Sequence, residues 1–484
     1  MRRRPSLPLA AAACLVLGIA SLALPSGPTY DPYAWLIWGR DLAHLDLVTS
    51  GTGTSWKPLP AMIDALLSPL GGRAASGWLV VARAGALFAV VMAFKLAWRV
   101  APAGRRLLAG TLAGATLLLT QYWVRQNGVG YAEGLAVALA LLAVDRHLDG
   151  KRTQAFALIV GVGLMRVEAW PFALVYGGWL WWTTAAGRAR RGTAVAGGLL
   201  LLPLVWFGGD WIGSGSLTTA ADRALKHKPG TPGASAHPAL AVLGEAFSML
   251  PVAAWPAIVF ALLTALIALA RRRTNAPTRM IAAFAAVAAA WTAIVAAMAQ
   301  HGYAGLPRYL FVADGLEAVL AGVGAAFAVD AIVAVAAQMR APRPARAAGL
   351  AAALLVCALF GLGSLSRATQ LPADAASIDS VADMDSGLAN AVRQAGGPGG
   401  VLRCGRPATT WYTVTALAWD LGVPSATVRD RPHGPRPVVF TPARGNWDVR
   451  AHGCRDGATT ARQPAPRGSA GAGSRTPGRS SART

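Results

Sequence analysis

Apolar runs long enough to cross a lipid bilayer recur along the first three quarters of the chain, and they constrain its fold more than any other feature. A helix needs roughly 20 apolar residues to cross a hydrocarbon core about 30 Å thick. Charged residues make up only 14% of the sequence, against roughly 25% in a soluble domain. The pattern therefore predicts an all-α polytopic membrane protein with about eleven transmembrane helices, over residues 7–25, 77–98, 107–124, 131–144, 154–165, 168–183, 193–212, 246–270, 280–299, 309–336 and 348–366.

The basic residues predict how these helices are oriented. A net charge of +23 would indicate nucleic-acid binding in a soluble protein. Here the Lys and Arg residues cluster in short loops, and one set of alternate loops carries more than twice as many as the other. Because cytoplasmic loops are enriched in Lys and Arg, we expect a multi-pass protein of the plasma membrane. Its N-terminus is predicted to be cytoplasmic and its C-terminus extracytoplasmic. We expect it to contact membrane lipid and not to bind nucleic acid.

The segments 154–165 and 168–183 leave two arrangements open. They form either a helical hairpin or one long helix that is kinked at Pro171. Basic residues flank the pair at both ends, which favours the hairpin because both ends then lie on the same side. Arg166 and Glu168 would lie at the hairpin tip, where we expect them to face protein or a wet cavity.

The composition changes after Arg367. We predict a transmembrane domain over 1–370, a small extracytoplasmic α/β domain over 371–455 and a disordered tail over 456–484. The expected elements of the α/β domain are helices at Met384–Ala395 and Trp411–Leu421 and extended runs at Val401–Cys404, Ala426–Val428, Val438–Thr441 and Trp447–Ala451. Cys404 and Cys454 are either a disulfide or two free thiols.

The loop after the first apolar run holds an acid, a lysine and several aromatic residues. Asp31 lies between Tyr30 and Tyr33, and Pro32 suits the first turn of a helix. Trp residues then follow at helical spacing, which predicts a short helix along the membrane surface. Asp31 could be a catalytic base or a plain helix N-cap. Lys57 could bind an anion or extend to lipid headgroups.

These features, in this order, resemble the GT-C glycosyltransferases over about residues 1–370. The shared elements are an Asp in the first outer loop, short interfacial helices, the Lys57-Pro58-Leu59-Pro60 run and Arg308-Tyr309-Leu310. The chain is most similar to the aminoarabinose transferases and the protein O-mannosyltransferases, which use polyprenyl-phosphate sugars. It departs from them at Pro32, where many relatives have a second acid, and at Leu59, where the family has Pro.

The resemblance implies a glycosyltransferase that moves a hexose or pentose from a polyprenyl-phosphate donor to an extracytoplasmic acceptor by an inverting single displacement. It implies that Asp31 is the catalytic base and that Lys57 and Arg308 lie near the carrier phosphate. Further candidates for substrate binding are Tyr30, Tyr33, Arg125, Glu133, His301 and Tyr309. Glu133 could instead only cap a helix, and His301 could belong to an ordinary loop. The outer loop 213–245 could be a lid or a passive connector.

The sequence contains no His, Cys and Asp cluster with metal-ligand spacing, so we expect neither a metal nor another cofactor. High Ala, Gly and Arg content suggests a GC-rich bacterial genome and hence a cell-envelope acceptor, either a glycan, a lipid or a protein. Two other functions stay open, a transporter or flippase of envelope precursors and a non-catalytic envelope scaffold. The sugar, the acceptor and the oligomeric state are not predicted.

Overall fold

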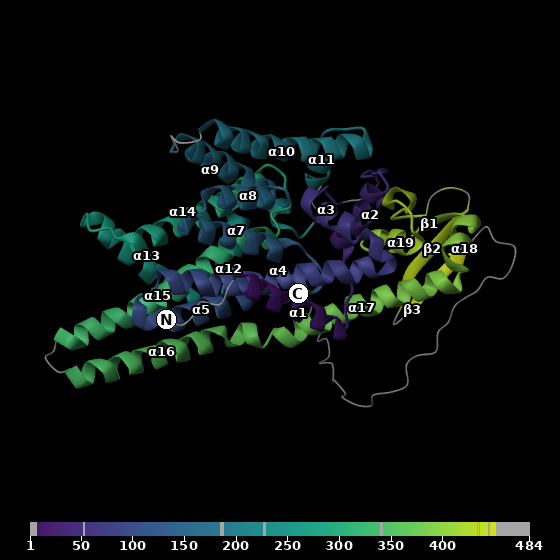
Figure 1. Cartoon of the computed structure of the whole chain (residues 1–484). Helices are drawn as coiled ribbons and strands as arrows, with labels where there is room; N and C mark the ends of the chain where they lie inside the picture. The colour runs from purple at the N-terminus through teal and green to yellow at the C-terminus, as the bar shows by residue number, and fades with distance from the viewer. Residues whose placement is uncertain are drawn as a thin grey trace, which may run out of the picture.

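The computed structural model describes residues 7–51, 54–183, 188–225, 229–338, 342–432, 434, 436–443 and 446–451. These residues form a helical bundle with an α/β segment at one end (Figure 1). Within them, five helical stretches are long and apolar enough to cross a membrane, or six if one bent pair is a single span. The chain is therefore a multi-pass membrane protein, whereas the number of about eleven spans stays a prediction.

The centre of the bundle is the long helix α15 (Phe311–Gln338). It packs against α4 (Ala74–Val100), α5 (Arg106–Leu118), α13 (Ala254–Ala270) and α14 (Ala276–Gln300). Most of its first half is buried. Because α15 contacts most of the bundle, the start of this helix has a fixed position relative to the neighbouring helices. Residues just before and in its first turn are therefore held in place.

Small residues allow the close approach of these helices. A Cβ atom on Gly322 would overlap the carbonyl oxygen of Ala109 in α5. A Cβ atom on Gly324 would overlap the carbonyl oxygen of Ala257 in α13. Membrane helices gain little from the hydrophobic effect between them, so van der Waals contact between closely packed backbones is a main source of association.

The predicted hairpin is confirmed, and the alternative of one kinked helix was wrong. Helices α8 (Arg152–Gly163) and α9 (Trp170–Trp182) run antiparallel, with Phe156 of α8 beside Gly177 of α9. The Trp170 side chain at the other end of the pair donates a hydrogen bond to the carbonyl of Gly163, at 3.1 Å. The hairpin brings the chain back to the side from which it entered.

Two predicted helices are broken in the structure. The run 246–270 is not one straight helix, because α12 (Pro238–Met249) and α13 meet at 102° around Pro251. Proline cannot donate a helical hydrogen bond and disfavours helix in the preceding residue. The run 107–124 ends at Leu118, and a separate short helix α6 (Trp123–Gly128) follows. The other helices of the bundle are α1 (Leu7–Ala20), α7 (Glu133–Leu148), α10 (Arg188–Ser214), α11 (Thr219–Ala224) and α16 (Pro342–Ala368).

The first outer loop forms two short helices, α2 (Tyr30–Ala43) and α3 (Pro58–Leu67). The tryptophans of α2 led to the prediction that this helix lies along the membrane surface, but their side chains contact protein. Trp35 and Trp38 are fully buried in protein and pack edge-on against Trp78 and Trp56. Helix α2 is therefore packed into the protein core through its tryptophan face, and its orientation along the membrane surface stays a prediction.

The C-terminal segment contains both helices and strands, as predicted. Its elements are α17 (Leu371–Gln394), α18 (Gly397–Cys404), β1 (Arg406–Ala408), α19 (Val414–Leu421), β2 (Pro437–Ala443) and β3 (Asn446–Ala451). The sheet order is β1-β2-β3, with β1 parallel and β3 antiparallel to β2. Two expectations were wrong, since Val401–Cys404 is helical and most of Ala426–Val428 lies in the 3₁₀ turn Ser425–Thr427.

The cysteines are in two states. Cys404 is disulfide-bonded, whereas Cys14 and Cys357 are free. Its predicted partner Cys454 lies outside the described residues, as does the predicted tail 456–484.

We predict that Gly322→Ala destabilises the bundle, because the new methyl group forces α15 away from α5 at a cost of about 1–3 kcal/mol. The matched control is Gly361→Ala in α16, where a Cβ atom meets nothing within 4 Å. There the substitution gains helix propensity without overlap, about 1 kcal/mol. Thermal unfolding in detergent compares the two, and equal melting temperatures would contradict the packing argument.

Candidate active site

Asp31 lies in the first turn of α2, and both oxygens of its carboxylate accept hydrogen bonds from distant segments. Thr54 Oγ1 donates to Asp31 Oδ1 at 2.7 Å, and Arg308 Nη2 donates to Asp31 Oδ2 at 3.0 Å. The N-cap of the helix is Thr29, which makes no side-chain cap. The reading of Asp31 as a plain N-cap was therefore wrong, because its side chain contacts other elements of the protein.

Glu133 is the centre of a buried group of charges. It begins α7 and is 3% exposed. Its Oε1 atom lies 3.3 Å from Lys57 Nζ, 3.1 Å from Arg166 Nη1 and 3.6 Å from Arg308 Nε. One carboxylate oxygen is thus shared by three cations from three separate segments, and Glu133 does more than cap its helix.

Two further carboxylates complete this group. Arg308 also pairs with Asp31, and Arg166 Nε donates to Glu168 Oε2 at 3.2 Å. We call these six residues, Asp31, Lys57, Glu133, Arg166, Glu168 and Arg308, the charge network. Its three acids balance its three cations, as buried charges require.

The position of Lys57 argues against a role at the lipid surface. It precedes α3 as its N-cap residue, and its side chain is only 12% exposed. Burial lowers the pKa of Lys57, and the nearby Glu133 carboxylate opposes this shift. The reading that Lys57 extends to lipid headgroups was wrong, because its ammonium group points into the protein.

Aromatic rings hold the three cations in place. The Arg308 guanidinium lies 4.3 Å from the centre of the Tyr131 ring, and that of Arg166 lies 4.0 Å from the Tyr309 ring. The Lys57 ammonium lies 4.9 Å from the Trp35 ring. A cation over an aromatic face is attracted by the ring quadrupole, so these contacts restrict the side chains without using their hydrogen-bond donors.

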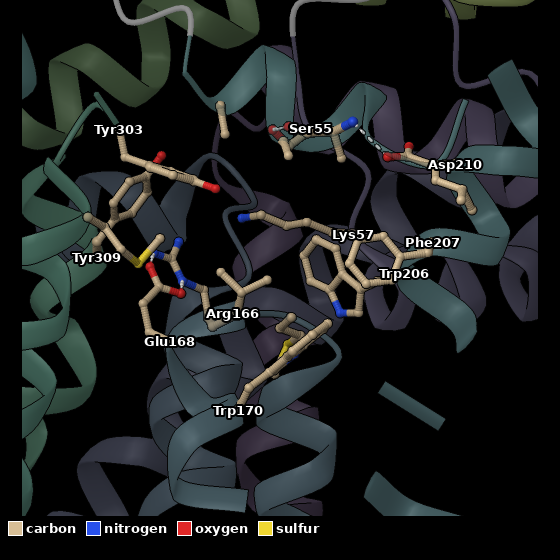
Figure 2. A pocket seen from close by; sticks show the side chains of 17 residues that line it. Ser55, Lys57, Arg166, Glu168, Trp170, Trp206, Phe207, Asp210, Tyr303 and Tyr309 are labelled. Atoms are coloured by element: carbon tan, nitrogen blue, oxygen red, sulfur yellow. Dashed lines mark hydrogen bonds and ion pairs between the residues drawn. The ribbon is translucent and has the colours of Figure 1, made fainter. Parts of the chain in front are cut away.

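A cavity of about 230 Å³ opens beside the charge network. Figure 2 shows Lys57 reaching across it toward Arg166, Tyr303 and Tyr309, with Trp206 and Phe207 on the opposite side. One end of the lining therefore holds Lys57, Arg166 and Glu168, and the other end is mainly aromatic, although Asp210 also lies there. Its other lining residues are Ser55, Met165, Val167, Glu168, Trp170, Asp210, Leu217, Ala220, Ala221, Ala224 and Met298.

Helix α11 forms one wall of this cavity, so part of the loop 213–245 contacts the site. The backbone N–H of Ala220 donates to Asp210 Oδ2 at 2.7 Å. Ser55 Oγ donates to the carbonyl of the same Ala220 at 2.8 Å. These bonds tie the loop to α10 and to the first outer loop. The basic residues Lys226, His227 and Lys228 of this loop lie outside the described residues.

Four other candidate residues lie away from the charge network. The ring of Tyr30 packs edge-on against Trp411, and Tyr33 Oη donates to Asp385 Oδ2 at 3.0 Å, so both contact the C-terminal segment. Arg125 in α6 and His301 after α14 are exposed. Neither lines the cavity.

Sequence reasoning brought together Asp31, Lys57 and Arg308, and the ion pairs confirm that they lie close together. It also predicted that Arg166 and Glu168 face protein or a wet cavity, which is confirmed. It did not assign Arg166 to the same group of charges. The signal that could have suggested this assignment was the presence of Arg166 and Glu168 inside an otherwise apolar stretch. Thr54 and Tyr131 had no distinguishing signal in the sequence.

The fold is shared with known membrane transferases. The structure of ArnT, the aminoarabinose transferase of Cupriavidus metallidurans, bound to undecaprenyl phosphate matches with a TM-score of 0.51 and 13% sequence identity, over 90% of this chain and 92% of that chain. Its apo structure matches with a TM-score of 0.50 and 14% identity over the same shares. An Archaeoglobus fulgidus oligosaccharyltransferase tethered with an acceptor peptide matches with a TM-score of 0.50 and 11% identity, over 87% of this chain and 63% of that chain.

Both proteins belong to the GT-C superfamily, and this chain has their fold. No family model matches the sequence, and no curated protein matches it either. The predicted resemblance to GT-C transferases is therefore confirmed at the level of the fold. In the part of the chain that the structure describes, no three His, Cys, Asp or Glu side chains are grouped to hold a metal ion.

We predict that Glu133→Gln strongly destabilises the protein. Removing the shared anion leaves Lys57, Arg166 and Arg308 without their common partner, and breaking a buried ion pair costs about 3–5 kcal/mol. The control is Glu245→Gln in α12, a half-buried acid that accepts a hydrogen bond from Ser248 and has no ion pair among the described residues. Thermal unfolding in detergent tests the difference. Equal stability of the two variants would mean that Glu133 does not organise the cations.

Proposed function

We propose that this protein is a membrane glycosyltransferase that moves a sugar from a polyprenyl-phosphate donor to an extracytoplasmic acceptor. One observation carries the proposal, namely that Asp31, Lys57 and Arg308 belong to one charge network, and that Lys57 of this network lines a cavity with a charged end and an aromatic end. Asp31 and Arg308 lie behind Lys57 in the network and do not line the cavity themselves. The shared fold supports it, because the transferases compared above use polyprenyl-phosphate-linked donors. The charged end suits the phosphate and sugar, and the aromatic end suits the prenyl chain.

In this proposal Asp31 is the general base. Its carboxylate accepts the proton of an acceptor hydroxyl while that oxygen attacks the anomeric carbon of the donor sugar. The bond from that carbon to the phosphate oxygen breaks at the same time, and the electron pair leaves with the polyprenyl phosphate. One displacement inverts the configuration at the anomeric carbon. General-base help of this kind contributes typically about 10²–10⁴-fold in rate.

Lys57 and Arg308 would stabilise the leaving phosphate. An ammonium group has three N–H donors and a guanidinium has five. The contacts of Lys57 with Glu133 and of Arg308 with Asp31 and Glu133 leave donor capacity on both side chains. Fixed donors aimed at developing negative charge are an effective source of catalysis in a site that excludes water.

The aromatic end would hold the first prenyl units of the carrier. Trp170, Trp206 and Phe207 line the cavity there. The indole N–H groups of Trp170 and Trp206 both donate to the carbonyl of Gly163, at 3.1 and 3.0 Å. With their polar atoms engaged, these rings present apolar surface to a ligand.

The location of the charges favours a transferase over a transporter. Asp31, Glu133 and Arg308 lie at or just before the start of α2, α7 and α15. These helix starts follow loops that the sequence predicts to be extracytoplasmic, so the proposed site lies at one membrane face, whereas substrate sites in transporters lie near the bilayer midplane on broken helices.

We predict that Asp31→Asn lowers sugar transfer by about 10²–10⁴-fold, because the amide cannot accept the acceptor proton. The assay uses the full chain in nanodiscs, with labelled polyprenyl-phosphate mannose or arabinose and an envelope fraction as acceptor. The control is Asp46→Asn, an exposed acid just after the same helix. Undiminished transfer by Asp31→Asn would remove the base assignment.

We predict that Lys57→Met weakens the binding of undecaprenyl phosphate by roughly 10–100-fold, since a hydrogen bond to a charged group contributes about 1.5–3 kcal/mol. Native mass spectrometry of detergent complexes measures the bound fraction. Lys95→Met is the matched control, because Lys95 is also paired with an acid, at 2.7 Å from Asp145, and does not line the cavity. Equal lipid binding by the two variants would exclude Lys57 from the phosphate site.

A further inference from the structure

A second cavity, of about 370 Å³, lies between the first outer loop and the C-terminal segment. Its walls come from α2, α3, the 3₁₀ turn Ser68–Arg73 and α19. The residues that matter here are Arg40, Asp64, Trp419 and Asp420. None of them lines the cavity beside the charge network. The volume is within the range of about 300–1,000 Å³ that is typical of small-molecule sites.

Asp64 is the strongest sign that this cavity binds something. It is 1% exposed, and neither carboxylate oxygen has a hydrogen-bond partner among the residues that the structure describes. A buried polar group without a partner costs about 1–3 kcal/mol, and a charged one costs more. Gly39 of α2 leaves room for this side chain, because a Cβ atom there would overlap the Cβ of Asp64. The protein thus keeps an acid at a cost to its own stability.

The other lining groups complement Asp64. Asp420 is a second, partly buried acid, and burial raises its pKa to about 7. Near neutral pH its carboxyl group can therefore both donate and accept a hydrogen bond. Arg40 is a donor that also pairs with Asp41, at 3.0 Å. Trp419 adds an aromatic ring, which is only partly buried.

The charges and hydrogen-bonding groups that line the second cavity indicate which class of ligand it could bind. Arg40 opposes a cation, and Asp64 and Asp420 oppose a phosphate or a carboxylate. A neutral polyhydroxy compound has hydroxyl donors for the acids, acceptors for Arg40 and an apolar C–H face for Trp419. These are the properties of a sugar ring.

We propose that this second cavity binds one uncharged sugar residue of the acceptor, which is then an oligosaccharide. The inference rests on the proposed transferase function for the role of the sugar as acceptor. Arg40 follows Asp31 by nine residues on the same helix α2. At 1.5 Å per residue this is about 13 Å, so a chain of several sugars, and not a monosaccharide, would reach both sites.

The experiment uses the full chain in phosphatidylcholine nanodiscs and saturation-transfer NMR with three neutral probes, mannotriose, arabinotriose and N,N′,N″-triacetylchitotriose. We expect one probe to bind and both Asp64→Asn and Trp419→Ala to weaken its binding at least tenfold. The controls Asp46→Asn and Tyr412→Ala change an exposed acid and an exposed aromatic residue and should bind as the wild type does. Two different cavity variants guard against a single variant that fails to fold.

The result is separable from the transferase proposal. Asp31→Asn should lose transfer and keep trisaccharide binding. A wild-type protein that binds a trisaccharide but transfers no sugar would refute the transferase function and leave the sugar site standing. The sugar site is overturned if no trisaccharide binds, if ethanolamine or methyl phosphate binds the cavity in its place, or if Asp64→Asn and Trp419→Ala bind as the wild type does.

Discussion

The sharing of one Glu133 oxygen by three cations is the interaction on which the rest of the site depends. Lys57 comes from the first outer loop, Arg166 from the hairpin tip and Arg308 from the turn before α15. A buried cation without an anion is strongly unfavourable, so a position that brings the cation to Glu133 is favoured for each of these segments. Arg166 and Arg308 have second partners in Glu168 and Asp31, so Glu133 matters most for Lys57. The carboxylate therefore sets the relative position of four segments that are far apart in the sequence.

The C-terminal segment contributes to the same geometry from outside the bundle. Thr415 Oγ1 donates to the carbonyl of Tyr30 at 2.8 Å, and Tyr33 donates to Asp385. These two residues flank Asp31 on α2. The helix that carries the proposed base is thus held on one side by buried tryptophans of the bundle and on the other by the C-terminal segment, which explains why Tyr30 and Tyr33 do not face the cavity.

The sequence predicted those features that depend on local pattern or on the membrane. Apolar runs located most helices, and basic flanks identified the hairpin around Arg166. It did not predict that Trp35 and Trp38 are buried in protein, because tryptophan spacing is the same on a helix that faces lipid and on one that faces other helices. Nor did it predict the pairing of Arg166 with Glu133, since a contact between residues 33 positions apart depends on how the helices pack. The order of the motifs and their residue types suggested Asp31, Lys57 and Arg308 as site residues through a resemblance to a family. They did not predict the distances between these side chains.

Each oxygen of the Asp31 carboxylate already accepts one hydrogen bond, which bears on whether water could react with the donor in place of the acceptor. Thr54 already donates to one carboxylate oxygen and Arg308 to the other. An ionised carboxylate has about four lone-pair sites, so these two donors leave room for an incoming alcohol while they hold the carboxylate in one orientation. Only a hydroxyl that approaches the remaining lone pairs could give up its proton to this group. Selectivity against hydrolysis would then depend on whether that approach is open to the acceptor and closed to solvent.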